Sequence, residues 1–402
     1  MLRRTENSRM SSILKLSRYS MVLVGIWRFP ISENQLIQTT YFTYSIFMQI
    51  FFFLLLTSMS IQFVTMTKAD KNAGISPEQL FTTFAFIINC SIIQIKVILC
   101  QTKRLKALIS YILVTEKELL RLKDTEIVQN HMQLSHFCQI SNLAIAYFTF
   151  GVALSIILGN ASERHQTEKY NSIYNTTLEK PFPYQLYYFG TDTQKHTKLL
   201  LVVNYFCVTV AGSMFVSTQV VFISCIIFAS SILKSLQIKF RKMSAARTNL
   251  LQFLRKLILE HQDVIAFVGK LNYSVKYLIL LEFLLNSVNM ASVCVQLITS
   301  QRNMFLAFPI FYCVLFVTLT FMLGWSANEV KVQSLDLTDA VYGSPWYEEN
   351  VRVRKMVLLI MMRTNRALTL TVGPFDAMTT QSALTIMKAS YSYITLVARS
   401  YH

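Results

Sequence analysis

Long apolar runs alternate with short polar or basic segments along most of the chain. A run of about 20 residues is long enough to cross a hydrocarbon layer of ~30 Å as a helix. Six runs meet this length: 42–66, 80–100, 139–158, 199–228, 277–298 and 304–325. The mean hydropathy of +0.41 and the charged fraction of 15%, against roughly a quarter in soluble domains, agree with a polytopic membrane protein.

The segment from 377 to the C-terminus is long enough to make a seventh span, but it is rich in polar residues. Five of these polar residues are separated by four, three, four and seven positions, so on a helix they form one stripe along the same face. They are Gln381, Thr385, Lys388, Ser392 and Arg399. Leu396 lies on the same stripe as its one apolar member. The stripe is typical of a water-filled path with a narrow apolar constriction, and equally of a helix buried among other helices.

The expected fold is therefore all-α, with seven transmembrane helices. Lysine and arginine gather in the N-terminal segment and in the loops after spans two, four and six, which places the N-terminus in the cytoplasm and the C-terminus outside. The Asn-x-Ser/Thr acceptors at Asn160 and Asn175 lie in the loop between spans three and four, which this orientation places outside. Both are predicted glycosylation sites.

The pattern also divides the chain into regions. Residues 1–40 form a cytoplasmic segment with a surface helix that Pro30 is expected to end, and no cleavable signal peptide is apparent. Residues 41–325 hold spans one to six, with helices in the inner loop 231–276 that extend spans four and five. Residues 326–376 form a cytoplasmic anchor, which the Gly373–Pro374 pair separates from the last helix, 377–402.

Charge and cysteine usage narrow the partners. The net charge of +17 is distributed in short clusters between apolar runs, which indicates anionic lipid headgroups rather than nucleic acid. All seven cysteines lie in or beside apolar runs, so no extracellular disulfide is expected. His131, His136 and Cys138 do not converge on one helical face, so no metal site is expected there. His261 is expected to be a buried residue of the cytoplasmic bundle.

Several motifs near the C-terminus resemble the signature of insect odorant receptors. They are residues 340–347 (AVYGSPWY), 354–355 (RK), 371–375 (TVGPF) and 386–396 (IMKASYSYITL). Residues 261–263 (HQD) and 328–329 (NE) are similar too. Pro374 departs from the family's frequent glycine at that position. The chain is more similar to an odorant-specific subunit than to the longer co-receptor of the family.

The resemblance implies a function and an assembly. The family's fold implies a tetramer whose last helices surround a pore, with the inner helices forming a shared anchor. The implied function is an odorant-gated, non-selective cation channel, assembled with the co-receptor in the plasma membrane of olfactory neuron dendrites. The gate position falls on Leu396, with Ser392, Lys388 and Arg399 lining the path. Because Lys388 and Arg399 repel cations, a heteromer that dilutes them is favoured.

The family's ligand pocket lies in the outer half of the bundle, between spans two, three, four and six. The residues expected there are Phe84, Ile88, Phe148, Gly151, Tyr205, Thr209, Phe308 and Tyr312. Aromatic residues in a membrane bundle are more often plain packing. Lys96 is expected to extend its ammonium to the membrane surface, and Glu282 to bond to the neighbouring anchor.

Other functions fit the residues less well. A G-protein-coupled receptor would need the N-terminus outside, and neither Asp-Arg-Tyr nor Asn-Pro-x-x-Tyr occurs. A transporter would show repeated halves and Gly/Pro-broken spans. No enzyme motif, and so no cofactor, is found. A gustatory receptor of the same superfamily is the closest alternative.

Overall fold

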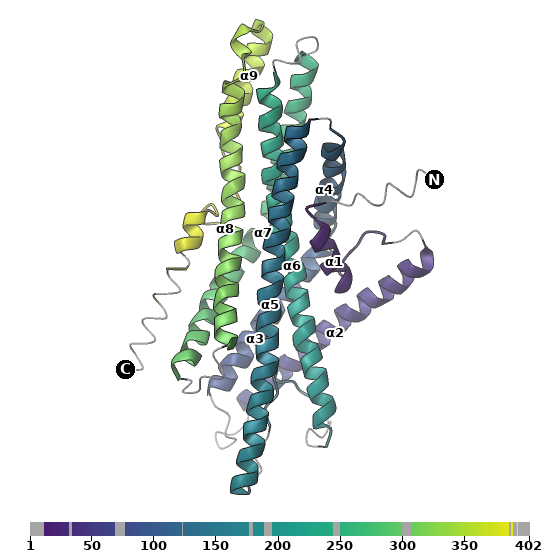
Figure 1. Cartoon of the computed structure of the whole chain (residues 1–402), viewed down its shortest axis with the longest axis vertical. Helices are drawn as coiled ribbons and strands as arrows, with labels where there is room; N and C mark the ends of the chain where they lie inside the picture. Colours follow the sequence, from purple (N-terminus) through teal and green to yellow (C-terminus); the bar gives the residue numbers. More distant parts are fainter. Residues whose placement is uncertain are drawn as a thin grey trace.

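The computed structural model describes residues 12–31, 34–68, 77–122, 124–176, 180–188, 195–243, 250–299, 307–385, 387–388 and 392. These residues form an all-α bundle (Figure 1). The helices are α1 (Lys15–Leu23), α2 (Gln35–Lys68), α3 (Pro77–Cys100), α4 (Lys103–Arg121), α5 (Thr125–Tyr174), α6 (Thr197–Arg241), α7 (Leu250–Thr299), α8 (Ala307–Tyr342), the 3₁₀ turn η3 (Trp346–Glu348) and α9 (Val351–Thr364).

The longest helices extend well beyond a bilayer. α5 and α7 have 50 residues each, which at a rise of 1.5 Å per residue is ~75 Å, more than twice the hydrocarbon thickness. Figure 1 shows α5, α6, α7 and α8 running along the long axis, with α9 at one end. α6 is the central helix, because it packs against α5, α7, α8, α3 and α1.

Six helices in the described ranges are long and apolar enough to cross a membrane: α2, α3, α5, α6, α7 and α8. Each holds one of the six spans expected from hydropathy, except that residues 304–306 of the sixth span lie outside the described residues. The chain is therefore an all-α polytopic membrane protein. Of the expected seventh span, residues 380–385 are helical. Leu396 and Arg399 lie outside the described residues, so the complete seventh helix stays a prediction.

The N-terminal helix ends earlier than the sequence indicated. α1 stops at Leu23, and Gly25 then takes a φ of +76° with its Cα facing Ser45, where an added Cβ would lie 2.9 Å from the Ser45 Cα. Only glycine tolerates both the positive φ and this approach. The expectation that Pro30 ends the helix was wrong, because the backbone turns at Gly25. The Oγ atoms of Ser17 and Ser224 are 2.9 Å apart, which joins α1 to α6.

Ion pairs join the end of α6 to the start of α5. Lys242, just after α6, contacts Asp124, the N-cap of α5, at 2.8 Å and Glu126 at 2.8 Å. The Lys242 ammonium lowers the pKa of Asp124 below its ordinary value. Both carboxylates in turn raise the pKa of Lys242. The ion pairs hold the end of α6 to the start of α5.

A short hairpin lies between α9 and the helical residues 380–385. Thr371 and Ala377 pair across it, and Gly373 at its turn has a φ of +60°. Its backbone N–H donates to the Lys276 carbonyl of α7 at 2.9 Å. A Cβ at Gly373 would lie 2.6 Å from Leu280 of the same helix. The Gly373–Pro374 break is thus a tight turn seated on α7.

Candidate functional site

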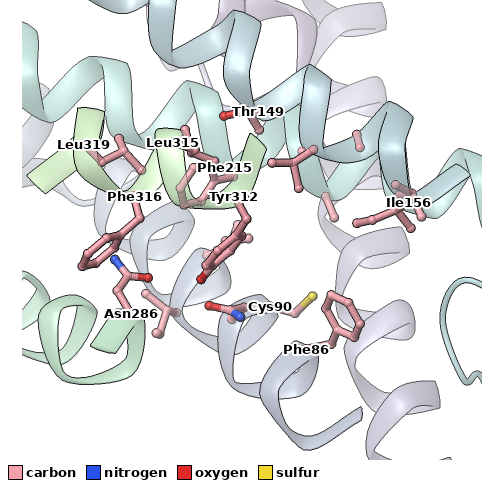
Figure 2. A pocket seen from close by; sticks show the side chains of 18 of the residues that line it. Phe86, Cys90, Thr149, Ile156, Phe215, Asn286, Tyr312, Leu315, Phe316 and Leu319 are labelled. Atoms are coloured by element: carbon pink, nitrogen blue, oxygen red, sulfur yellow. The ribbon is translucent and has the colours of Figure 1, made fainter. Parts of the chain in front are cut away.

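A partly open cavity of about 150 Å³ lies among α3, α5, α6, α7 and α8 (Figure 2). Its lining consists of Phe86, Asn89, Cys90, Ile92, Ile93, Lys96, Thr149, Val152, Ala153, Ile156, Tyr184, Val208, Ala211, Gly212, Phe215, Glu282, Asn286, Phe308, Tyr312, Leu315, Phe316 and Leu319. A cavity of this volume accommodates a benzene-sized molecule.

Helical periodicity explains which residues reach the cavity. On α3 the lining positions recur every three or four residues, from Phe86 through Cys90 and Ile93 to Lys96. The same spacing on α8 brings in Phe308, Tyr312, Leu315 and Leu319. Figure 2 shows the labelled side chains of Phe86, Cys90, Tyr312 and Phe316 directed from α3 and α8 into one space.

Charged and polar groups form one wall. The Lys96 Nζ donates to Glu282 Oε2 at 2.7 Å, and the Gln219 Nε2 donates to Glu282 Oε1. The Lys96 ammonium is also 5.9 Å from the ring centroid of Phe215. Lys96 is 2% exposed and Glu282 8%. A buried ion pair inside an apolar membrane bundle is a functional candidate, because desolvating both charges is unfavourable.

A segment after α5 contributes Tyr184 to the cavity lining. The backbone N–H of Tyr184 donates to Asn204 Oδ1 at 2.9 Å, and Asn204 Nδ2 donates back to the Tyr184 carbonyl at 3.0 Å. The Tyr184 ring packs edge-on against Phe86 with centroids 5.1 Å apart. Asn204 therefore fixes the loop 180–188 at Tyr184, whose side chain lines the cavity.

Two of the eight residues expected to bind ligand line this cavity, namely Phe308 and Tyr312. The other six expected residues lie on α3, α5 and α6 but are not among the lining residues. Phe84 packs on Phe63, Ile88 is partly buried, and Phe148 packs on Tyr147. Gly151 faces Phe311, the Tyr205 hydroxyl donates to Asn160, and the Thr209 hydroxyl donates to the Phe206 carbonyl. These six residues lie on the same helices as the cavity lining but at other positions around them, since each residue turns a helix by ~100°.

The ion pair differs from its expected role. Lys96 does not extend to a membrane surface, and Glu282 does not bond to the anchor, because the two side chains pair with each other. They are 186 residues apart in sequence. The signal that could have found them is that each is a lone charge in an apolar run, since such charges require a partner.

The predicted pore residues are partly described. Lys388 and Ser392 are exposed on the chain, and the Ser392 hydroxyl donates to the Lys388 carbonyl at 3.1 Å, as in a helical turn.

Of the predicted glycosylation sites, Asn175 is exposed. Asn160 is 6% exposed, and its Nδ2, the atom that would carry a glycan, donates to the Pro181 carbonyl at 3.1 Å.

Sequence reasoning missed a second buried polar cluster. The Glu116 Oε1 accepts from the Ser12 backbone N–H at 2.7 Å and lies 3.0 Å from His131 Nε2, whose Nδ1 is 2.8 Å from the Ser231 hydroxyl. His136 is exposed, so the two histidines do not meet. In the described part of the chain, no three His, Cys, Asp or Glu side chains gather around a possible metal position.

Comparisons with known proteins agree on one family. A family model described as 7tm Odorant receptor matches residues 76–391. Odorant receptor 10 of Aedes albopictus is 33% identical over 147 residues, which are 37% of this chain and 39% of that protein. Odorant receptor Or2 of Anopheles gambiae is 32% identical over 149 residues, with the same two shares. The match thus spans about two fifths of these relatives' length.

Solved structures share the fold along nearly the whole chain. The insect olfactory receptor OR5 from Machilis hrabei, in complex with eugenol, superposes with a TM-score of 0.78 and 15% identity, covering 96% of this chain and 98% of that chain. A second structure of OR5 from Machilis hrabei superposes with a TM-score of 0.77 and 15% identity, covering 96% of this chain and 97% of that chain. At this identity the likeness is one of fold.

Proposed function

Since the chain belongs to the 7tm odorant receptor family, we propose that it is an odorant-specific subunit of a ligand-gated, non-selective cation channel. The observation that carries this proposal is the mainly apolar cavity of about 150 Å³ among α3, α5, α6, α7 and α8. Membership of this family makes the chain a receptor rather than an enzyme. It also favours an odorant receptor over the gustatory receptor that the sequence left as an alternative.

The cavity suits a small volatile ligand. Its lining is mainly aliphatic and aromatic, so burial of apolar ligand surface supplies most of the binding free energy, at ~25 cal/mol per Å². The described OR5 complex holds eugenol, a small odorant, within the same fold. For this chain we propose a ligand of similar small size in the cavity of Figure 2.

We further propose a heteromeric pore, with co-receptor subunits, in the plasma membrane. The last helices would line the path, with Leu396 at the constriction and Ser392, Lys388 and Arg399 along it. The turn at Gly373 supports a route from ligand to pore, because it rests on Leu280 of α7, two residues from the cavity-lining Glu282. A ligand that shifts α7 would therefore move the start of the last helix.

Recording current in cells tests this proposal. The chain is expressed with and without a co-receptor subunit, and small esters, ketones, alcohols and terpenes are applied. A cation current within tens of milliseconds is expected only with the co-receptor. A response of a G-protein reporter in the absence of current would contradict the channel.

A pair of substitutions on α8 locates the ligand. Tyr312→Ala removes a cavity-lining ring and is expected to raise the half-effective concentration about tenfold or more. Phe321→Ala removes an exposed ring of the same helix and is expected to leave it within about twofold. Equal effects of both variants would place the ligand elsewhere.

A further inference from the structure

The Lys96–Glu282 pair gives the proposed ligand site a chemical preference. We propose that the Lys96 ammonium donates a hydrogen bond to a neutral oxygen acceptor on the odorant, such as the carbonyl of a ketone, aldehyde or ester. This inference rests on the proposed function and names the ligand class for the same cavity.

The hydrogen-bonding capacity of the wall supports a donor role. Both oxygens of Glu282 accept hydrogen bonds, Oε2 from Lys96 and Oε1 from Gln219. A primary ammonium has three N–H donors, and the bond to Glu282 uses one. Because Lys96 lines the cavity, its other donors are the charged N–H groups that a ligand in the cavity can reach.

The burial of the pair makes such a bond effective. Lys96 is 2% exposed and faces the Phe215 ring at 5.9 Å, so the ammonium is removed from bulk water. Hydrogen bonds to a charged donor in a low-dielectric site are stronger than those between neutral groups. An odorant of the same volume without an oxygen acceptor cannot form this hydrogen bond with the Lys96 ammonium, so it is expected to bind more weakly.

The charge balance of the pair excludes ionised ligands. Lys96 and Glu282 together are neutral, so an anionic ligand would compete with Glu282 for the ammonium and add a second negative charge beside the carboxylate. A cationic ligand would meet a carboxylate whose two oxygens are already engaged. A neutral acceptor needs no rearrangement of the pair.

Matched odorants that differ only in the acceptor test the inference. Acetophenone and α-methylstyrene exchange C=O for C=CH₂ at nearly constant shape, as do 2-heptanone and 2-methyl-1-heptene. In wild-type channels with co-receptor, each ketone is expected to act at about tenfold or more lower concentration than its olefin. Benzoate is expected to be inactive. Potency ratios near one, or benzoate acting more potently than acetophenone, would overturn the inference.

A double variant assigns the preference to Lys96. Lys96→Met combined with Glu282→Gln removes both charges, which avoids a buried charge without its partner and keeps an acceptor for Gln219. The ketone-to-olefin ratio is expected to fall to about threefold or less, while the olefin response persists. An unchanged ratio would overturn the inference.

Two controls separate the alternatives. Lys239→Met with Glu260→Gln removes a different ion pair, between α6 and α7, which is 2.6 Å long and away from the cavity lining, and this variant is expected to preserve the ratio. Asn286→Leu removes a different cavity donor, and loss of the preference here but not in the double variant would overturn the inference.

The outcomes distinguish the two proposals. Currents with both classes of odorant at equal potency leave the proposed function intact and overturn only the acceptor preference. No current with any odorant, from wild-type channels shown to reach the cell surface, overturns the proposed function and this inference with it. The wild-type ratio needs no variant, so the test does not depend on the double variant folding.

Discussion

The carboxylate of Glu116 shows how much of the inner bundle can depend on one side chain. It is 1% exposed and joins α4 to His131 of α5 and to Ser12, just before α1. His131 carries the connection on to Ser231 of α6. A buried group with several such partners is destabilising to remove, because the partners are then left without their acceptor.

Glu116→Ala is therefore expected to lower stability by about 3 kcal/mol, as is typical when one member of a buried pair is removed. Glu118→Ala removes an exposed carboxylate of the same helix and is expected to change stability by no more than about 0.5 kcal/mol. Thermal unfolding of both variants in detergent, followed by size exclusion, measures the difference. Equal melting temperatures would show that the Glu116 cluster does not stabilise the bundle.

Hydropathy predicted the helices of the fold because period and length determine which segments are helical and apolar. It did not predict which face of each helix meets the others. Lys96 and Glu282 were recognised separately, but their pairing depends on how α3 and α7 are placed, which no local pattern encodes. For the same reason Phe86 lines the cavity where Phe84 was expected. The Glu116 cluster was missed because its members come from four segments.

At the scale of elements, the hairpin between Thr371 and Ala377 connects α9 to the helical residues 380–385. Three positions of α7 spaced by four residues hold it: Asn272 Oδ1 accepts from the Thr371 N–H at 2.9 Å, the Lys276 carbonyl accepts from Gly373, and Leu280 lies against Gly373. The hairpin therefore moves with α7, which also lines the cavity.

Gly373→Ala is expected to disturb this connection. The substitution adds a Cβ 2.6 Å from Leu280 at a φ of +60°, where a non-glycine residue costs roughly 1–2 kcal/mol. Ligand-evoked current should fall severalfold or require more odorant. Gly269→Ala is the matched control on α7, because an added Cβ there meets nothing within 4 Å, and it should leave current unchanged. Equal currents from the two variants would remove the hairpin from gating.

The ion pairs between α5 and α6 predict a limited pH dependence. Because the pKa of Asp124 is lowered, its contribution is complete above the ordinary carboxyl pKa of about 4 and is lost as pH falls through the lowered value. Because the pKa of Lys242 is raised, its contribution is complete below its ordinary pKa and is lost as pH rises through the raised value.

Asp124→Asn tests these signs, because asparagine is an equally good helix N-cap and only the charge is removed. The variant should melt below wild type at pH 7, and the gap should close as pH falls below 4. Melting in detergent at several pH values measures the gap, and high salt should reduce it. A gap that is constant from pH 7 to pH 3 would contradict the role of charge.

For the whole molecule, the glycosylation sites report orientation. Asn175 ends α5 in an exposed left-handed conformation, whereas the Asn160 amide is buried against Pro181. If the N-terminus is cytoplasmic, the wild-type protein should carry a glycan that slows its electrophoretic migration until a glycosidase removes it. Asn175→Gln should abolish this glycosidase-sensitive shift, and Asn160→Gln should leave the shift unchanged. A wild-type protein without any shift, in cells that glycosylate a control receptor, would count against the external placement of this loop.

Assembly decides how the charge of Lys388 acts on ions. The side chain is exposed in the single chain, and a pore made of four copies would present four ammonium groups to each passing cation, which repels it. With co-receptor subunits the number falls. Lys388→Gln is therefore expected to raise single-channel conductance, by a factor that grows with the number of copies of this subunit per channel. Lys68 is an exposed lysine at the end of α2, and Lys68→Gln is expected to leave the conductance unchanged. An unchanged conductance in the Lys388 variant would place this side chain away from the ion path and leave the narrow apolar position at Leu396 to account for the pore.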